Sequence, residues 1–93
     1  MTGTDNVNVW GETREQARDR RRAQAVLVAY LKSDLYERIP TPGDDDGMTW
    51  ESPLKWRVRI SAPGPRVEII DPRGEPFADY VDVDGYELEK VLP

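Results

Sequence analysis

The sequence predicts a two-layer α+β domain in which one long N-terminal helix packs on a four-stranded antiparallel meander sheet. Three observations support this prediction. Apolar residues repeat at helical spacing between Thr13 and Arg38. Apolar and polar residues then alternate from Leu54 to Ala62. The rest of the chain is divided by proline- and glycine-containing turns, at the short intervals that join neighbouring antiparallel strands.

The chain is short enough to form one domain, because its 93 residues fall below the length at which chains usually divide. Residues 1–12 are largely polar and are expected to form a flexible tail, with a short strand or a packed anchor made by Val7, Val9 and Trp10 as the alternative. Residues 13–93 are expected to form the folded domain. No segment has the pattern of a signal peptide, and no apolar run approaches the ~20 residues that cross a bilayer. A cytoplasmic location is therefore the default expectation, and no membrane is expected among the partners.

The helix is expected over residues 13–38 and has two chemically different halves. Thr13 and Gln16 have the spacing of a capping box, in which each side chain bonds the backbone amide of the other residue. The first half is rich in arginine and has almost nothing apolar to bury. The second half carries the apolar stripe, which consists of Ala23, Leu27, Tyr30, Leu31 and Leu35. A proline at position 40 stops the helix.

A helix of this length should extend beyond the sheet. About 26 residues at 1.5 Å per residue give ~39 Å, whereas strands of seven or eight residues span only ~25 Å. The arginine-rich half is the natural part to overhang by about two turns.

The clearest strand covers residues 54–62, where every second side chain is apolar. This alternation predicts one face in the core and one wet, basic face. The turn at 62–65 leads to a second strand at 66–71. A register with Ser61 opposite Arg66 places apolar side chains opposite each other on the inner face and an ion pair on the outer one.

The C-terminal part has two interpretations. Residues 77–83 are expected to form the third strand, and Asp84-Gly85 is a strong signal for a two-residue hairpin turn. We favour a fourth strand over residues 86–92, with a short C-terminal helix as the alternative. In the hairpin, Asp82 would face Glu87, a like-charge pair that is mildly destabilising.

The composition excludes much chemistry. The chain has neither cysteine nor histidine, so thiolate and imidazole catalysis and their zinc sites are ruled out. The acidic runs 44–47 and 82–85 resemble parts of a calcium loop. Their spacing fails, because Pro53 and Val91 occupy the twelfth position, where a carboxylate is needed. No catalytic, cofactor-binding or metal-binding residue is identified, and no cofactor is expected.

The net charge of −5 conceals an alternation along the chain. Residues 13–32 carry a net charge of +4, residues 33–53 carry −5, residues 54–70 carry +3 and residues 71–93 carry −5. Blocks of opposite sign are not typical of a simple polyanion or polycation.

Three features suggest a contact surface. The arginines share a broad helix face that suits phosphates or carboxylates. Carboxylates and a tyrosine on the last hairpin could imitate a phosphate backbone. A tryptophan in a polar context is typical of interface hot spots. The candidate partner-binding residues are Trp10, Arg14, Arg18, Arg21, Arg22, Tyr80, Asp82, Asp84, Glu87 and Glu89.

These features predict a non-catalytic protein-interaction module, a small acidic protein of accessory or inhibitor type whose general plan resembles such proteins of phages. The alternative is a modulator of a nucleic-acid transaction, which acts as a DNA mimic through the acidic hairpin or binds nucleic acid weakly through the arginines. A homodimer is also considered, because one helix covers only one face of the sheet. An enzyme is not expected.

Overall fold

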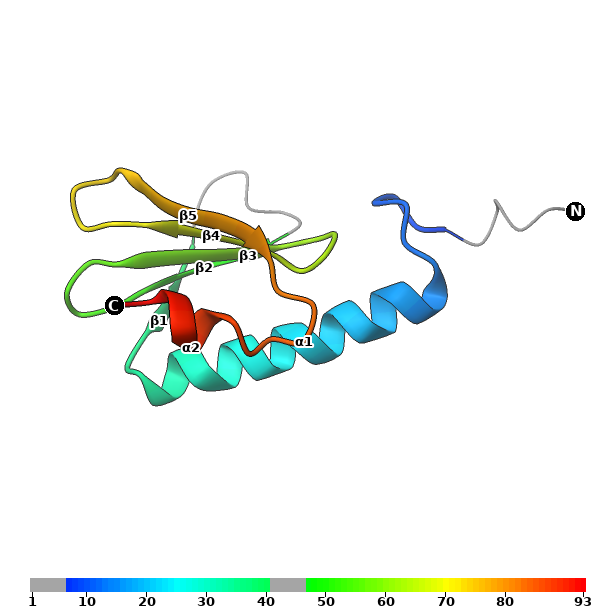
Figure 1. Ribbon diagram of the computed structural model, residues 1–93, viewed down its shortest axis with the longest axis horizontal. Helices are drawn as coiled ribbons and strands as arrows, with labels where there is room; N and C mark the ends of the chain where they lie inside the picture. The colour runs from blue at the N-terminus through cyan, green and yellow to red at the C-terminus, as the bar shows by residue number, and fades with distance from the viewer. Residues whose placement is uncertain (1–6, 41–46) are drawn as a thin grey trace, which may run out of the picture.

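The computed structural model describes residues 7–40 and 47–93, which form one antiparallel sheet with two helices on the same face (Figure 1). The elements are α1 (Arg14–Ser33), β1 (Glu37–Ile39), β2 (Gly47–Glu51), β3 (Arg57–Ser61), β4 (Arg66–Ile70), β5 (Pro76–Val81) and α2 (Leu88–Val91). The strands pair in chain order, each antiparallel to its neighbours.

The α+β class and the meander are confirmed, but the predicted number of strands is wrong. The described residues form five strands, because β1 and β2 precede the three strands that were recognised. The fourth strand, favoured at residues 86–92, is absent, and the alternative of a short C-terminal helix is confirmed by α2. Most of the acidic loop between β1 and β2, including Asp44–Asp46, lies outside the described residues.

The core lies between the helices and the sheet. The predicted pairing of β3 with β4 is confirmed, with Ser61 opposite Arg66. Its inward-facing residues are fully buried against both helices. The largest buried apolar side chains are Leu27, Leu31, Val58, Ile60, Val67, Ile69 and Leu88.

The strand β3 begins three residues later than predicted. Leu54 lies in the turn before β3 and is exposed. It therefore does not belong to the core, although the alternating pattern includes it. Trp56 is half-buried and meets Phe77 edge-to-face, with ring centroids 5.0 Å apart. This aromatic pair covers the end of the core that the strand does not reach.

The outer face of the sheet is neutralised, although its sequence predicts a basic face. Arginines on β3 and β4 pair with carboxylates on neighbouring strands, and the Arg66 guanidinium makes two hydrogen bonds to one carboxylate. The closest contacts are Arg57–Glu51 at 2.9 Å, Arg59–Glu68 at 3.4 Å and Arg66–Asp79 at 2.6 Å. Exposed pairs of this kind contribute little stability, but they cancel the positive charge of this face.

The helix α1 ends five residues before the predicted boundary. The amide of Tyr36 donates to the Leu31 carbonyl at 2.9 Å, and the amide of Leu35 donates to the Lys32 carbonyl at 3.2 Å. These bonds form a Schellman motif with Leu35 at the left-handed position, φ 68°. Tyr36 therefore takes the buried place that the apolar stripe assigned to Leu35.

Leu35→Gly is expected to raise the free energy of unfolding by about 0.5 kcal/mol. Leu35 is 71% exposed, so it contributes little burial. Glycine adopts the left-handed conformation without the strain of roughly 1 kcal/mol that leucine has there. Part of this gain is offset, because glycine gives the unfolded chain more conformational entropy. Urea unfolding of both proteins tests this. The control is Leu54→Gly, which is also exposed but has no positive φ; equal effects of the two changes would contradict the strain argument.

The N-terminal half of α1 continues past the end of the sheet (Figure 1). The predicted capping box is present: Thr13 Oγ1 accepts from the Gln16 amide at 3.1 Å, and Gln16 Oε1 accepts from the Thr13 amide at 2.9 Å. Residues 7–12 fold back over this overhang, so that part of it is covered (Figure 1).

Candidate interaction site

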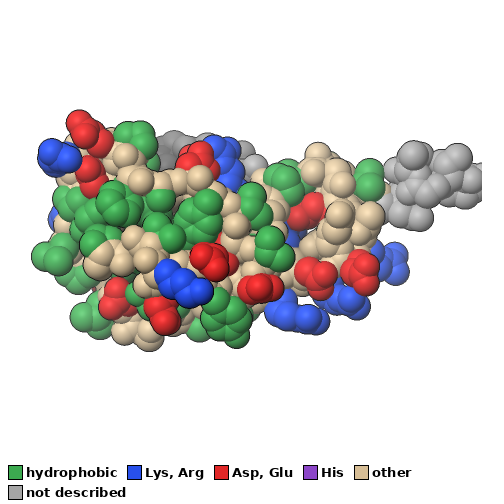
Figure 2. All heavy atoms as spheres, viewed as in Figure 1, with side chains coloured by type: hydrophobic (Ala, Val, Ile, Leu, Met, Phe, Trp, Pro, Cys, Tyr) green, Lys and Arg blue, Asp and Glu red, His purple; other side chains and the backbone are tan. Residues whose placement is uncertain are grey.

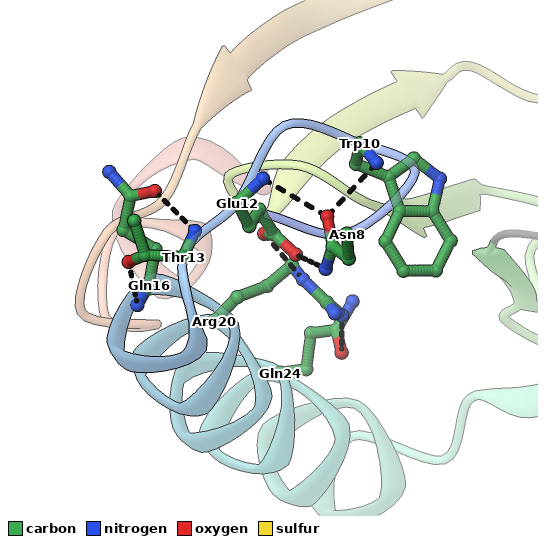
Figure 3. A network of polar contacts seen from close by, with 7 residues as sticks. All are labelled: Asn8, Trp10, Glu12, Thr13, Gln16, Arg20 and Gln24. Atoms are coloured by element: carbon green, nitrogen blue, oxygen red, sulfur yellow. Dashed lines mark hydrogen bonds and ion pairs between the residues drawn. The ribbon is translucent and has the colours of Figure 1, made fainter. Parts of the chain in front are cut away.

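The described part of the predicted tail, residues 7–12, forms a loop organised by Asn8 (Figure 3). Asn8 Oδ1 accepts from the amides of Trp10 and Glu12, at 2.9 and 3.0 Å. Asn8 Nδ2 donates to Glu12 Oε1 at 2.9 Å. The Asn8 side chain thus binds both the backbone of the turn and the Glu12 carboxylate. Asparagine is common in such turns because its side chain hydrogen-bonds the backbone two residues later.

The loop is joined to α1 by a buried ion pair. Arg20 Nε donates to Glu12 Oε2 at 2.7 Å, and both side chains are more than nine-tenths buried. Arg20 also donates to Gln24 Oε1 at 3.0 Å. The Arg20 guanidinium carbon lies 5.2 Å from the centre of the Trp10 ring, within the range of a cation–π interaction (Figure 3). Trp10 therefore has a fixed place although it remains partly exposed.

The environment of Glu12 favours its charged form. Burial alone would raise the pKa of this carboxyl group. Hydrogen bonds from Arg20 and Asn8, the charge of Arg20 and the Gly64 amide together outweigh burial and lower the pKa below the ordinary value of 4.5.

This lowered pKa predicts acid weakening of the loop. Above pH 4.5 the contribution of Glu12 to stability is fully present, and it is lost as the pH falls through the folded-state pKa. The free energy of unfolding, measured with urea, should decrease from about pH 6 to about pH 3. In Glu12→Gln this decrease should be smaller, because the titrating carboxyl group is absent. The same pH dependence in both proteins would contradict this role of Glu12.

A cavity of about 410 Å³ opens beside this loop. The loop and the first turns of α1 form one wall, and the β3–β4 turn and the chain after β5 form the other. Gly64 in that turn has φ 134°, and a Cβ there would lie 2.6 Å from the Arg66 amide nitrogen, so the position requires glycine. The lining residues are Trp10, Gly11, Glu12, Gln16, Asp19, Arg20, Pro63, Gly64 and Val83.

The predicted C-terminal hairpin is wrong, and Asp82 explains why. Its carboxylate is fully buried and accepts from the amides of Gly85, Glu87 and Leu88 at 2.8–3.2 Å. These amides lie in the turn and at the start of α2, so the chain bends toward α1 instead of returning along β5. Asp82 is therefore unavailable to a partner, and the row of carboxylates expected of a DNA mimic is not formed.

A second cavity, of about 260 Å³, lies where the chain leaves β5. It shares Val83 with the first cavity, and its lining residues are Val81, Asp82, Val83, Asp84, Tyr86 and Glu87. Three apolar side chains around it are unusually open to solvent: Val81 is 54% exposed, Val83 67% and Tyr86 65%. We call Trp10, Val81, Val83 and Tyr86, with the carboxylates of Asp19, Asp84 and Glu87, the Trp10–Tyr86 surface.

Apart from the buried Asp82, the structure divides the predicted site residues among three places. Trp10, Asp84 and Glu87 line the two cavities. Tyr80 is half-buried against the core, and burial together with the charges of Asp82 and Glu87 raises the pKa of its hydroxyl group. The remaining residues, Arg14, Arg18, Arg21, Arg22 and Glu89, are exposed on the helices and line neither cavity.

Sequence reasoning missed the central residues of this surface. Val81 and Val83 were assigned to the strand at residues 77–83 and were not identified as part of a contact surface. The ion pair of Glu12 and Arg20 was missed because the arginine was grouped with its exposed neighbours. One available signal was position: Arg20 lies on the same helix face as Ala23 and Leu27, which are buried.

Among the described residues, no helix combines the length and apolar character needed to cross a bilayer. The described residues also contain no group of three or more acidic side chains arranged to hold a metal ion.

No family model matches the chain, and neither the curated proteins nor the solved structures include a match to it.

Proposed function

We propose that this protein is a non-catalytic interaction module that binds another protein through the Trp10–Tyr86 surface. The observation that carries the proposal is the exposure of Trp10, Val81, Val83 and Tyr86 around two adjoining cavities. Contiguous exposed apolar side chains with a polar rim are typical of protein contact sites.

The surface is held in place before any partner arrives. Trp10 is fixed by Asn8 and Arg20, and the segment that carries Val83 and Tyr86 is fixed by Asp82. A preorganised site loses less conformational freedom on binding, so more of its contact energy appears as affinity.

The charge of the rim indicates the chemistry of the partner. The carboxylates of Asp19, Asp84 and Glu87 lie among the lining residues of the cavities. A protein segment with one or two apolar anchors flanked by lysine or arginine would complement both features. Glu12, the one nearly buried carboxylate at the first cavity, is already paired with Arg20 and serves structure.

Affinity capture with matched variants tests the proposal. Wild-type protein, Val83→Asp and Leu54→Asp are used as baits in lysate of the source organism, with and without nuclease. Val83 and Leu54 are both highly exposed and lie near opposite ends of β3, so neither change should unfold the protein. Circular dichroism melts check this.

The expected result is a protein that is retained by the wild type and Leu54→Asp but lost with Val83→Asp. Equal retention by all three baits would reject the Trp10–Tyr86 surface. Retention that disappears with nuclease would favour the alternative of a nucleic-acid modulator, in which the exposed arginines of α1 contact phosphates.

A further inference from the structure

A second surface lies on the exposed side of α1. At 3.6 residues per turn, five basic residues of this helix fall within an arc of about 100° around its axis. The middle of the arc lies opposite Leu27, which is fully buried, so the arc faces solvent. We call this face the basic stripe. Its exposed cations are Arg14, Arg18, Arg21, Arg22 and Lys32.

Carboxylates near α1 lie beside the basic stripe and not within it. By the same helical spacing, Glu15 and Asp19 follow one border of the arc, on the side of Tyr30. Glu89 lies on that side as well, since its charge acts on the Tyr30 hydroxyl group. Figure 2 shows basic side chains along the lower edge of this end of the molecule, with acidic side chains next to them. A partner that follows the stripe therefore meets cations, with carboxylates at one border.

The fold leaves most of the charge of the basic stripe uncompensated. Within the described residues, Arg18 is the only member with an ion pair, 3.7 Å from Glu15 and 4.0 Å from Asp19. All three side chains are more than half exposed, and pairs of this kind contribute little. The sheet arginines, by contrast, are matched with carboxylates on neighbouring strands. The stripe therefore presents positive charge that an external anion can neutralise.

The shape of the basic stripe indicates an extended anion. From Arg14 to Lys32 the stripe covers about 27 Å of helix at 1.5 Å per residue. None of its cations lines either cavity of the Trp10–Tyr86 surface. A single small anion would contact only one or two of these cations, whereas a chain of phosphates can contact them in succession.

The basic stripe lacks the apolar residues that a protein or a membrane would contact. Between its cations lie the small exposed residues Ala25 and Ala29. None of the large apolar side chains exposed in the described part of the chain belongs to it. Protein interfaces bury an apolar or aromatic centre, and a helix on a membrane inserts an apolar face. A nucleic acid needs neither, because contacts of cations with phosphates supply nearly all of its non-specific affinity.

The form of α1 favours a DNA duplex among nucleic acids. Proteins that bind single strands stack the bases on exposed aromatic side chains, and the basic stripe has none. The major groove of duplex RNA is too narrow for side chains to read, whereas that of DNA admits an α-helix. The N-terminal half of α1, which carries the arginines of the stripe, continues past the end of the sheet and is therefore free to approach such a groove (Figure 1).

We propose that the basic stripe binds the phosphate backbone of double-stranded DNA without sequence preference. The arginine half of α1 lies along the major groove, where Arg21 and Arg22, at opposite borders of the arc, reach phosphates of the two strands. Each guanidinium can bond two phosphate oxygens. The net charge of −5 opposes this contact, so binding should be weak and strongest at low salt. The Trp10–Tyr86 surface involves another side of α1, so the two contacts are independent.

Fluorescence anisotropy with a labelled DNA duplex of about 20 base pairs tests the proposal, at about 20–200 mM salt. For the wild type, the slope of the logarithm of the binding constant against that of the salt concentration should be about −4. Arg18→Gln/Arg22→Gln removes two phosphate contacts. It should raise the Kd at least about tenfold at low salt and make the slope shallower by about two.

Two controls separate the basic stripe from net charge and from the Trp10–Tyr86 surface. Lys55→Gln/Arg73→Gln makes the same change in net charge at the opposite end of the sheet, so it should leave the slope unchanged. Val83→Asp should leave DNA binding unchanged, because Val83 lies outside the stripe. Failure of the stripe and failure of the Trp10–Tyr86 surface are thereby distinguishable. Circular dichroism confirms that each variant folds.

Salt-dependent binding of the DNA duplex that weakens with Arg18→Gln/Arg22→Gln alone would support the proposal. No binding by about 100 μM wild-type protein at about 20 mM salt would overturn it. Equal effects of the stripe variant and the Lys55→Gln/Arg73→Gln control would do the same. Equal or tighter binding of single-stranded DNA, duplex RNA or poly-glutamate would also overturn it, because the stripe would then recognise something other than the DNA duplex.

Discussion

Asp82→Ala is expected to lower the free energy of unfolding by about 3 kcal/mol, the largest effect of any single polar change considered. The substitution removes the acceptor shared by the amides of Gly85, Glu87 and Leu88. A buried donor without a partner costs about 1–3 kcal/mol, and more when the lost acceptor was charged. In a domain of this size the melting temperature should fall by roughly 15 °C.

Two further variants sharpen this prediction. Asp84→Ala changes an exposed carboxylate two residues away, for which the structure shows no hydrogen bond within the described residues, and should have almost no effect. Asp82→Asn keeps one oxygen acceptor, so its loss of stability should be smaller than that of Asp82→Ala and larger than that of Asp84→Ala. Thermal melts followed by circular dichroism measure all three. A small loss for Asp82→Ala, equal to that of Asp84→Ala, would show that the carboxylate does not organise residues 82–88.

Arg20→Leu is expected to lower the free energy of unfolding by about 2–3 kcal/mol. Breaking a fully buried ion pair typically costs 3–5 kcal/mol because one charge is left uncompensated. The cavity beside Glu12 lets water reach its carboxylate, so we expect a value near the lower end. The same change also removes the cation from the Trp10 ring, so the N-terminal loop should loosen first.

A double-mutant cycle separates the pair from its surroundings. Glu12→Leu/Arg20→Leu removes both charges and should recover part of the loss, since two apolar side chains can replace a buried pair at little cost. Arg21→Leu is the matched control, because Arg21 is exposed and unpaired within the described residues, and its effect should stay within about 0.5 kcal/mol. Additive single-mutant effects would contradict a direct interaction between Glu12 and Arg20.

Features that depend on neighbouring residues were predictable from the sequence. The capping box of Thr13 and Gln16 is formed as its spacing indicates. The register of β3 with β4 follows from the alternation of apolar and polar residues on both sides of a short turn. In each case one favourable arrangement satisfies both the backbone and the apolar pattern.

Features that depend on competition between two alternative local structures could not be predicted from the sequence. The apolar stripe extends to Leu35, but Tyr36 can bury its ring only if the helix ends and Leu35 adopts a left-handed conformation. Asp84-Gly85 suits a hairpin turn, yet Asp82 accepts from the amides of Gly85, Glu87 and Leu88 and directs the chain to α1. The outcome depends on distant packing, which a local pattern does not encode.

The sequence indicated some residues of the candidate site but not that they lie together. Trp10 was identified from its polar context, and the acidic segment after β5 from its charge. Their meeting at one end of the molecule requires Arg20 to reach Glu12 across eight positions and Asp82 to redirect the chain. The position of Arg20 on the buried face of α1 hints at the first interaction but does not name its partner, and no local pattern indicates the second. The cavities between these segments could therefore not be predicted.

Site-specific photocrosslinking in living cells tests the central claim most directly. A photoreactive phenylalanine derivative replaces Tyr86 in one variant and Leu54, an exposed residue outside the Trp10–Tyr86 surface, in another. Binding through this surface predicts a discrete crosslinked product from position 86 and none from position 54. Crosslinks from position 54 alone, or none from either position, would contradict it.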